Sequence, residues 1–180
     1  MIELLYKKGK LLVRKTENKD QQWLAKWLSD PDVLQYYEGR DNPFDLEKVK
    51  EEFYDSEGIA KGCIVEYEGQ PIGYIQFYEV EGKYLEKYGY DQSEKTFGID
   101  QFIGEVDYQG QGIGTWLVSS MTEFLIQEKE ANRVVMDPQT WNERALKCYE
   151  KCGYEKVKLL PKHEWHEGEY RDCWLIEFKR

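Results

Sequence analysis

A glycine-rich segment is the first part of this chain whose residue types and spacing suggest chemistry. Glycines stand at alternate positions between a predicted strand and a predicted amphipathic helix. They let the backbone approach a ligand closely, and the free N–H groups at the start of a helix suit a pyrophosphate. A turn that serves packing alone has the same pattern, and neither the Lys-Ser/Thr of a P-loop nor a GxGxxG in a first βα unit is present. The residues are Gln109, Gly110, Gln111, Gly112, Ile113, Gly114 and Thr115.

Two carboxylates stand at positions where a strand would hold or present them. Asp100 interrupts the predicted strand Phe97–Ile103. A carboxylate inside a strand needs a partner or a task, because burying it unpaired is costly, unless it lies on the solvent face. Asp137 follows a short apolar run and precedes Pro138, a pair that also starts an ordinary turn.

Histidine and cysteine spacing gives no metal site. His163 and His166 are three residues apart, but no third soft ligand is near, so we expect no metal. Two of the four cysteines are four residues apart in a predicted helix, where a disulfide is unfavourable, and none forms a CxxC pair. We therefore expect reduced thiols. The cysteines are Cys63, Cys148, Cys152 and Cys173.

Apolar spacing in the first part of the chain predicts one strand and two helices. The strand is Leu11–Thr16. Asp20–Ser29 has apolar residues at helical spacing, and we expect Pro31 to end that helix. A hydrophobic staple around the N-cap Asp45 starts a second helix near Leu46.

A hairpin and a loop are predicted next. The extended runs Ile59–Tyr67 and Ile72–Val80 form the hairpin, with Glu68-Gly69-Gln70-Pro71 as its turn. Residues 81–95 show neither the helical nor the strand period. We expect them to form a loop, and a loop of this length in a compact domain usually serves a site.

Strands and helices alternate in the remainder. One helix with a single apolar stripe follows the glycine-rich segment, and a second runs from the N-cap Asn142 to about Lys151, with Gly153 at its end. A polar loop containing residues 163–168 separates the last two strands. The order βααβββαβαββ predicts an α/β fold with a mixed, mostly antiparallel sheet and helices on both faces. The strands are Phe97–Ile103, Val134–Met136, Val157–Leu160 and Cys173–Phe178.

Composition narrows the class of protein. A chain of 180 residues, 41% of them apolar, predicts one domain spanning 1–180. The 35 acidic and 25 basic residues leave a net charge of −10, which repels nucleic acid and attracts cations. No apolar run has the length of a membrane span, and Met1–Lys10 does not have the pattern of a signal peptide. We expect a cytoplasmic protein without membrane or nucleic-acid partners.

Two motifs in order resemble the paired acetyl-CoA motifs of the GNAT N-acetyltransferase superfamily. The first is Gln109-x-x-Gly112-x-Gly114, and the second is Asn142-x-x-Ala145-x-x-x-Tyr149-x-x-x-Gly153-Tyr154. The predicted strand order agrees, so the resemblance covers nearly the whole chain. More narrowly, four stretches are similar to the aminoglycoside 6'-N-acetyltransferases, nearest to the acetyltransferase half of the bifunctional acetyltransferase-phosphotransferases. These stretches are Gly98–Gly104, Met136–Pro138, Asn142–Tyr149 and His163–Gly168. Because the chain ends at Arg180, we expect acetylation only.

The resemblance implies acetyl-CoA as co-substrate, with no metal. Backbone amides of Gln111–Thr115 would hold its pyrophosphate. Phe102 and Ile103 would hydrogen-bond the pantetheine arm through the main chain, and Asn142, which is also a plain N-cap candidate, would lie near the thioester.

The resemblance also implies roles for acidic and aromatic residues. Asp100 would take a proton from the acceptor amine or only orient that amine. Tyr149 would protonate the leaving thiolate, since an ordinary tyrosine pKa exceeds that of a thiol, unless it is a core residue. Asp137 would bind the acceptor. Weaker acceptor candidates, with a solvated loop as the alternative for the two glutamates, are Gln76, Tyr78, Gln101, Glu164 and Glu167.

The implied reaction is acetyl transfer to the 6'-amine of aminoglycosides. Two alternatives stay open: an acetyltransferase of another amine, such as a siderophore precursor or a polyamine, and a non-catalytic module that binds acyl-CoA. Residues 81–95 would close over the sugar or form a dimer contact. Monomer and homodimer are both compatible with the sequence.

Overall fold

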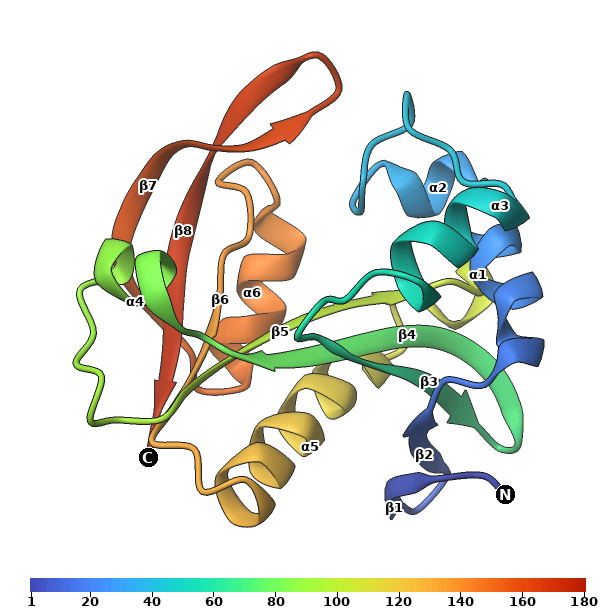
Figure 1. Cartoon of the computed structure of the whole chain (residues 1–180), viewed down its shortest axis with the longest axis horizontal. Coiled ribbons are helices and arrows are strands. Elements are labelled where there is room, and N and C mark those ends of the chain that lie inside the picture. Colours follow the sequence, from blue (N-terminus) through green and yellow to red (C-terminus); the bar gives the residue numbers. More distant parts are fainter. The chain divides into compact units, whose positions relative to one another are not determined.

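The computed structural model describes all 180 residues and contains an eight-stranded sheet in the order β1-β2-β3-β4-β5-β6-β8-β7 (Figure 1). β5 and β6 run parallel, whereas β1 and β2, β2 and β3, β6 and β8, and β7 and β8 pair antiparallel. The predicted mixed sheet is confirmed. The strands are β1 (Leu4–Lys8), β2 (Leu11–Lys15), β3 (Lys61–Tyr67), β4 (Gln70–Glu79), β5 (Thr96–Ile103), β6 (Arg133–Met136), β7 (Glu155–His166) and β8 (Glu169–Lys179).

Six α-helices accompany the sheet. None of them is both long and apolar enough to cross a lipid bilayer. Two 3₁₀ turns, Asn18–Asp20 and Val106–Tyr108, and a π-helical turn, Lys50–Tyr54, complete the helical segments. The helices are α1 (Gln21–Trp27), α2 (Pro31–Leu34), α3 (Leu46–Val49), α4 (Gly82–Tyr88), α5 (Ile113–Glu128) and α6 (Glu143–Lys151).

The chain forms two compact units. The first consists of Met1–Gln76 and Gln101–Ile113, and the second of Phe77–Asp100 and Gly114–Arg180. β4 and β5 each contribute residues to both units. That the whole chain acts as one domain stays a prediction.

Aromatic and aliphatic side chains from helices and strands form the core of the first unit. Trp27 of α1 lies edge-on to Phe102 of β5, with ring centroids 6.2 Å apart, and Tyr74 of β4 stacks on Phe102 at 5.7 Å. Only glycine fits at position 104, because a Cβ there would collide with the Trp27 ring. The buried members of this core are Leu24, Trp27, Leu28, Val33, Leu34, Phe44, Val49, Ile64, Tyr74 and Phe102.

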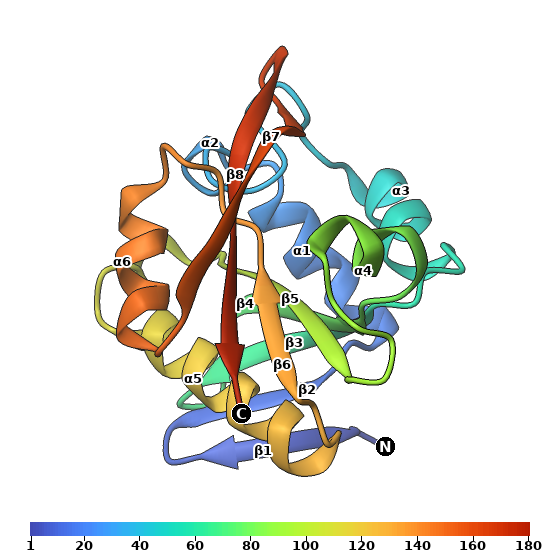
Figure 2. The ribbon, with the colours of Figure 1, turned by 90° about the vertical axis from the view of Figure 1, so that its left-hand side faces the viewer.

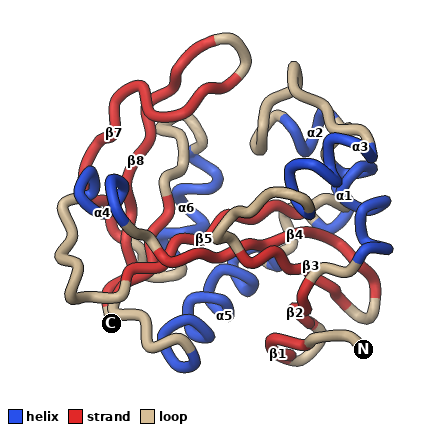
Figure 3. The backbone as a smooth tube through the Cα atoms, viewed as in Figure 1, coloured by secondary structure: helices blue, strands red, loops and turns tan.

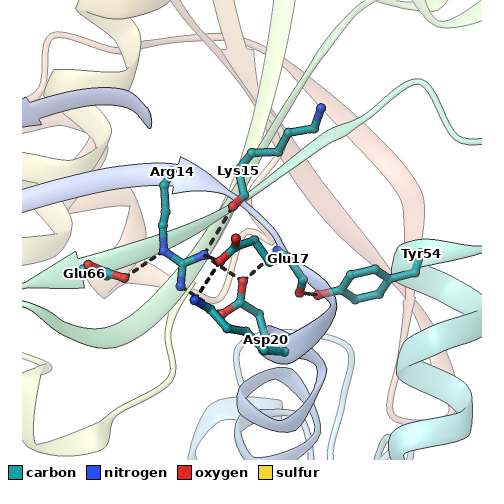
Figure 4. Close-up of polar contacts among 7 residues, drawn as sticks. Arg14, Lys15, Glu17, Asp20, Tyr54 and Glu66 are labelled. Carbon is teal, nitrogen blue, oxygen red and sulfur yellow. Dashed lines mark hydrogen bonds and ion pairs between the residues drawn. The ribbon is translucent and has the colours of Figure 1, made fainter. Parts of the chain in front are cut away.

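A buried ion network ties β2 to the start of α1 and to β3 (Figure 4). Arg14 donates two hydrogen bonds to Asp20, Nη1 to Oδ2 at 2.7 Å and Nη2 to Oδ1 at 2.9 Å, and its Nε donates to Glu66 at 2.8 Å. The side chain of Asp20 has no exposed surface and that of Arg14 is 3% exposed. Such a pair contributes little net free energy when intact, but removing either partner leaves a buried charge.

In the second unit, α4 and α6 lie on opposite sides of β8 (Figure 2). Alternate residues of β8 explain this arrangement, because successive side chains of a strand point to opposite faces. Cys173 and Leu175 share a buried core with Leu85 of α4, whereas the Phe178 ring contacts Tyr154 next to α6, with centroids 5.8 Å apart. The prediction of helices on both faces is confirmed for this unit.

The prediction of a loop over residues 81–95 was wrong in its first half. α4 occupies Gly82–Tyr88 and ends at Gly89, which has a φ of +80°. Only Leu85 and Tyr88 of this seven-residue helix are buried. Two apolar positions are too few for the helical period to be visible, so the helix depends on its contacts with the sheet.

Four other local predictions need correction. Pro31 begins a helix rather than only ending one, because Asp30 caps α2 by accepting from the Asp32 N–H at 2.9 Å and proline is favourable in the first helical turn. Gln70 and Pro71 belong to β4, so the turn of the first hairpin is shorter than predicted. Residues 163–166 belong to β7, so the β7–β8 hairpin is longer than predicted (Figure 3). The half-exposed strand β1, which the sequence analysis did not predict, precedes β2. Asp45 caps α3 as predicted.

Candidate active site

The glycine-rich segment has the backbone conformation that its composition predicts. Gly110 and Gly112 have φ values of 74° and 80°, in the left-handed region that other residues rarely adopt. Gln109 and Gln111 stabilise the turn, with Nε2 donating to the carbonyls of Ile103 at 2.9 Å and Asp107 at 2.7 Å. The two glutamine side chains therefore hold the loop.

This loop has the features that a pyrophosphate requires. α5 begins at Ile113, runs for 16 residues and has no acidic residue in its first turn. No other part of the protein lies within 4 Å of where a Cβ at Gly112 or Gly114 would stand, so side chains at either position would project from the backbone. Unpaired N–H groups and the helix dipole at such a start favour an anion.

The start of α5 contacts α6, the helix that carries the second motif. Thr115 Oγ1 lies 3.3 Å from Cys148 Sγ, and Cys152 Sγ donates to the Thr115 carbonyl at 3.4 Å. All four cysteines are free thiols, as predicted. The Cys152 thiol and the Thr115 hydroxyl lower the pKa of Cys148 to about 6, against the opposing effect of burial.

α6 places Asn142 and Tyr149 as the second motif requires. Asn142 is the N-cap of the helix, and its side chain accepts from the Ala145 N–H at 3.2 Å. Tyr149 lies two turns further on and is half-buried. The N-cap interpretation of Asn142 is confirmed, while the cofactor roles of both residues stay predictions.

Two buried tyrosines of the second unit, Tyr78 and Tyr88, lie within the electrostatic influence of two partly buried carboxylates, Asp100 and Asp137. Burial raises the pKa of Tyr78, and the charges of Asp100 and Asp137 raise it further. Burial likewise raises the pKa of Tyr88, and Asp137 again contributes. The charges of Asp100 and Asp137, which are far apart in the sequence, therefore act on the same two tyrosines.

Gly98 explains how Tyr78 reaches this position. A Cβ at Gly98 would lie 2.5 Å from Cε2 and Cζ of the Tyr78 ring, closer than real Cβ contacts come. The ring of Tyr78 therefore crosses β5 directly over Gly98, two residues before Asp100. No larger residue fits beneath the ring without moving it.

A histidine that the sequence analysis did not assign to the acceptor site contacts Asp137. His163 Nε2 lies 2.7 Å from Asp137 Oδ2, and Lys87 Nζ of α4 lies 2.9 Å from His163 Nδ1. From the sequence, His163 itself was considered only as a metal ligand, although it lies in the stretch His163–Gly168 that resembles the aminoglycoside 6'-N-acetyltransferases. The structure has no cluster of three or more His, Cys, Asp or Glu side chains arranged to hold a metal ion.

The two glutamates of the β7–β8 hairpin differ. Glu164 Oε2 accepts from Gln139 Nε2 at 2.7 Å, and Gln139 in turn accepts from the indole N–H of Trp141. Partial desolvation and the nearby Asp137 raise the pKa of Glu164, although the residue remains exposed at the surface. Glu167 lies in the turn that follows β7, with a φ of +48°. Glu164 thus lies within the electrostatic influence of Asp137. The acceptor roles of Glu164 and Glu167 stay predictions.

Besides residues of the glycine-rich segment, four predicted site residues belong to the first unit. Gln76 accepts from the Tyr74 hydroxyl at 2.9 Å. The side chain of Phe102 is 8% exposed within the aromatic core, and the carbonyl of the neighbouring Ile103 accepts from Gln109. Gln101, at the junction of the two units, is half-buried in β5. The main-chain contacts of Phe102 and Ile103 with a cofactor stay predictions.

Comparison with known proteins agrees with both motifs. Residues 16–161 match the family described as acetyltransferase (GNAT) domain. Aminoglycoside N(6')-acetyltransferase type 1 of Klebsiella pneumoniae is 30% identical over 141 residues, covering 76% of this chain and 70% of that protein. The structure of AAC(6')-Ib in complex with ribostamycin and coenzyme A superposes with a TM-score of 0.78 and 26% identity, over 96% of this chain and 94% of that one. Spermidine N-acetyltransferase from Vibrio cholerae, at 15% identity and a TM-score of 0.77, shares the fold. The chain belongs to the GNAT family of acetyltransferases.

Proposed function

We propose that this protein transfers the acetyl group of acetyl-CoA to the 6'-amine of aminoglycosides and thereby inactivates them as antibiotics. The observation that carries the proposal is that the charges of Asp100 and Asp137 both act on the buried Tyr78 and Tyr88, beside the contact of Asp137 with His163. Aminoglycosides carry several ammonium groups, and carboxylates beside aromatic rings bind such groups through charge and cation–π attraction. Relatives named for this activity support the substrate class.

The reaction assigns a separate task to each part of the site. The acceptor nitrogen, once deprotonated, attacks the thioester carbonyl carbon, so that a C–N bond forms and the C–S bond breaks. Asp100 takes the ammonium proton directly or through water, or holds the amine while water takes it. The leaving thiolate receives a proton from Tyr149, and the second proton, which the attacking nitrogen loses as it becomes an amide, returns to Tyr149 through water. The first proton passes to solvent, so the products are an N-acetylated amine, coenzyme A and a proton.

Acetyl-CoA fits the glycine-rich segment for physical reasons. Its pyrophosphate would accept hydrogen bonds from the backbone N–H groups at the start of α5, where the glycines permit a close approach. No basic side chain is needed for this contact. The thioester end is assigned to the α6 side, near Asn142 and Tyr149.

A thiol-release assay with acetyl-CoA tests the proposed function. The acceptors are matched aminoglycosides with and without a 6'-amine, and spermidine serves as a different polyamine. We expect release of coenzyme A only with the 6'-amino compounds, together with a mass increase of one acetyl group on the antibiotic. Equal turnover of spermidine would favour the alternative polyamine acetyltransferase, and cofactor binding without any turnover would favour the binding module.

Tyr149→Phe tests the proposed general acid. The change keeps the ring and removes the proton donor, so kcat should fall on the order of 10²-fold with both KM values little changed. Steady-state kinetics with a 6'-amino aminoglycoside measure the effect. Tyr154→Phe is a matched control on the same segment, because its hydroxyl is buried against Thr122, at 2.6 Å. A loss of less than about threefold in Tyr149→Phe would assign this tyrosine to packing.

A further inference from the structure

A histidine lies between a lysine and the proposed acceptor carboxylate. His163 Nε2 is 2.7 Å from Asp137 Oδ2, and Lys87 Nζ is 2.9 Å from His163 Nδ1. The side chain of His163 is 7% exposed and that of Asp137 is 31% exposed. The ring is therefore shielded from water, while the carboxylate retains access to solvent.

The two contacts together determine the protonation of the ring. A lysine ammonium has only donors, so Nδ1 must accept from Lys87. The proton of a neutral imidazole is then on Nε2, where it is donated to Asp137. A protonated ring would carry donors on both nitrogens and would repel Lys87. The geometry corresponds to a neutral His163 with an Nε2–H.

Contacts of α4 with β7 and β8 hold the backbone of Lys87 in place beside the His163 ring. Lys158 of β7 donates to the Lys87 carbonyl at 2.5 Å. Leu85 and Tyr88 of α4 share a buried core with Leu160 of β7 and with β8. The Tyr88 ring also lies 6.5 Å from that of His163. The end of α4 is thus held at the point where Lys87 meets the histidine.

We propose that His163 is a positioning residue for acetyl transfer, which holds Asp137 in the orientation that receives the acceptor ammonium, and that Lys87 fixes the tautomer of His163. The proposal rests on the acceptor-binding role of Asp137 proposed above. A carboxylate accepts several hydrogen bonds, so Asp137 can hold the ring and an ammonium group together. Because the ring lies between Lys87 and Asp137, Asp137 contacts the imidazole rather than the lysine ammonium, and its other oxygen remains available to the substrate ammonium.

Matched substitutions separate positioning from folding. His163→Leu removes both contacts, whereas in His163→Gln the amide nitrogen can still donate to Asp137. We expect His163→Leu to raise the aminoglycoside KM on the order of tenfold, with the acetyl-CoA KM unchanged, and His163→Gln to recover most of this loss. Thermal melts establish that the variants are folded, and if the leucine variant does not fold, the comparison uses His163→Gln and Lys87→Met. An unchanged acceptor KM in His163→Leu, or equal rises in both KM values, would overturn the proposal.

A spectroscopic measurement tests the contacts from Lys87 through His163 to Asp137 without any acceptor. The chain has only two histidines, so ¹⁵N spectra of histidine-labelled protein are assigned by comparison with His163→Gln. We expect an unprotonated Nδ1 and a protonated Nε2 for His163 near neutral pH, and a mixture of tautomers in Lys87→Met. An Nδ1–H tautomer or a doubly protonated ring in the wild-type protein would contradict the proposal that Lys87 fixes the tautomer of His163.

These results are distinguishable from failure of the proposed function. If no aminoglycoside is acetylated, the thiol-release assay shows it with the wild-type protein, whatever the histidine spectra are. The KM comparison is then made with the amine that the acceptor screen identifies. If Asp137→Asn leaves the KM of that acceptor unchanged, Asp137 does not bind it and the positioning role of His163 is wrong.

Discussion

Asp100 is the residue on which the proposed chemistry depends most. It stands half-buried in β5, and its charge contributes to the raised pKa values of Tyr78 and Tyr88. Asp100→Asn keeps the shape and removes the charge. If the carboxylate takes the proton, kcat/KM should fall on the order of 10²-fold at neutral pH and recover in part as pH rises, because free amine then forms without help.

A pH profile of kcat and KM distinguishes the two roles left open for Asp100. A loss confined to the acceptor KM would assign it to holding the ammonium. Asp41→Asn is the matched control, because Asp41 is exposed and lies outside the candidate site. Wild-type kinetics of Asp100→Asn across the pH range would remove Asp100 from the mechanism.

Some residues of the candidate site could be predicted from the sequence and others could not. Asp100 and Asp137 became site candidates because the family resemblance gave roles to carboxylates that the residue pattern alone allowed to be a solvent-face residue and an ordinary turn. His163 and Lys87 were not, because their significance comes from contacts with each other and with Asp137, across 76 and 26 positions of the chain. Local pattern carries no information about which side chains a sheet brings together.

At the scale of elements, the loop before α5 separates two effects of glycine. Gly112 has a φ of +80°, whereas Gly114 lies in the first turn of α5 without a positive φ. A Cβ at either position projects from the backbone without meeting a neighbour. Gly112→Ala therefore adds backbone strain of about 1 kcal/mol, and both Gly112→Ala and Gly114→Ala place a methyl group where the pyrophosphate is expected.

Calorimetry with coenzyme A and chemical unfolding together measure these effects. We expect both alanine variants to bind coenzyme A at least tenfold more weakly, while only Gly112→Ala loses folding stability. Gly69→Ala serves as the control for strain alone, since Gly69 lies in the β3–β4 turn with a φ of +82°. Unchanged affinity in Gly114→Ala would show that the backbone does not approach the ligand closely there.

The helices that were predicted correctly have an apolar pattern repeated over several turns or clear capping residues at their ends. α5 has a sustained apolar stripe, and α6 begins at an asparagine cap and ends before a glycine. α4 was missed because its seven residues have only two buried positions and its stability comes from the core of the second unit. The same helix supplies Lys87 and Tyr88 to the candidate site. Because α4 was not predicted, the placement of these two residues could not be predicted either.

The Arg14–Asp20 network gives a prediction about acid stability that concerns β2 and α1. Burial alone would raise the pKa of Asp20, but hydrogen bonds from Arg14 and from the Glu17 N–H lower it on balance. A carboxyl whose pKa is lower in the folded protein stabilises it above the unfolded pKa of about 3.9, and this contribution is lost as pH falls through the folded value.

Urea unfolding between pH 7 and pH 3 measures this contribution. Asp20→Asn should destabilise the protein at neutral pH by about 3 kcal/mol or more, since Arg14 is left buried without its charged partner, and should flatten the decline in stability below pH 4. Asp41→Asn, at an exposed position, should change neither. An acid decline in Asp20→Asn as steep as in the wild-type protein would assign acid sensitivity to other carboxylates.

At the scale of the whole molecule, the net charge of −10 acts on the two substrates in opposite directions. It attracts a polycationic aminoglycoside and repels the anionic coenzyme A, and both effects are screened over about 8 Å at physiological ionic strength. Raising the salt concentration should therefore increase the aminoglycoside KM, while the acetyl-CoA KM stays constant or falls. Asp137→Asn should raise the aminoglycoside KM at low salt and flatten its salt dependence, because it removes a charge close to the bound ammonium. Initial rates from low to high potassium chloride, with each substrate varied in turn, measure the salt dependence of both KM values. A parallel rise of both KM values in the wild-type protein would mean that salt acts on the fold rather than on attraction of the acceptor.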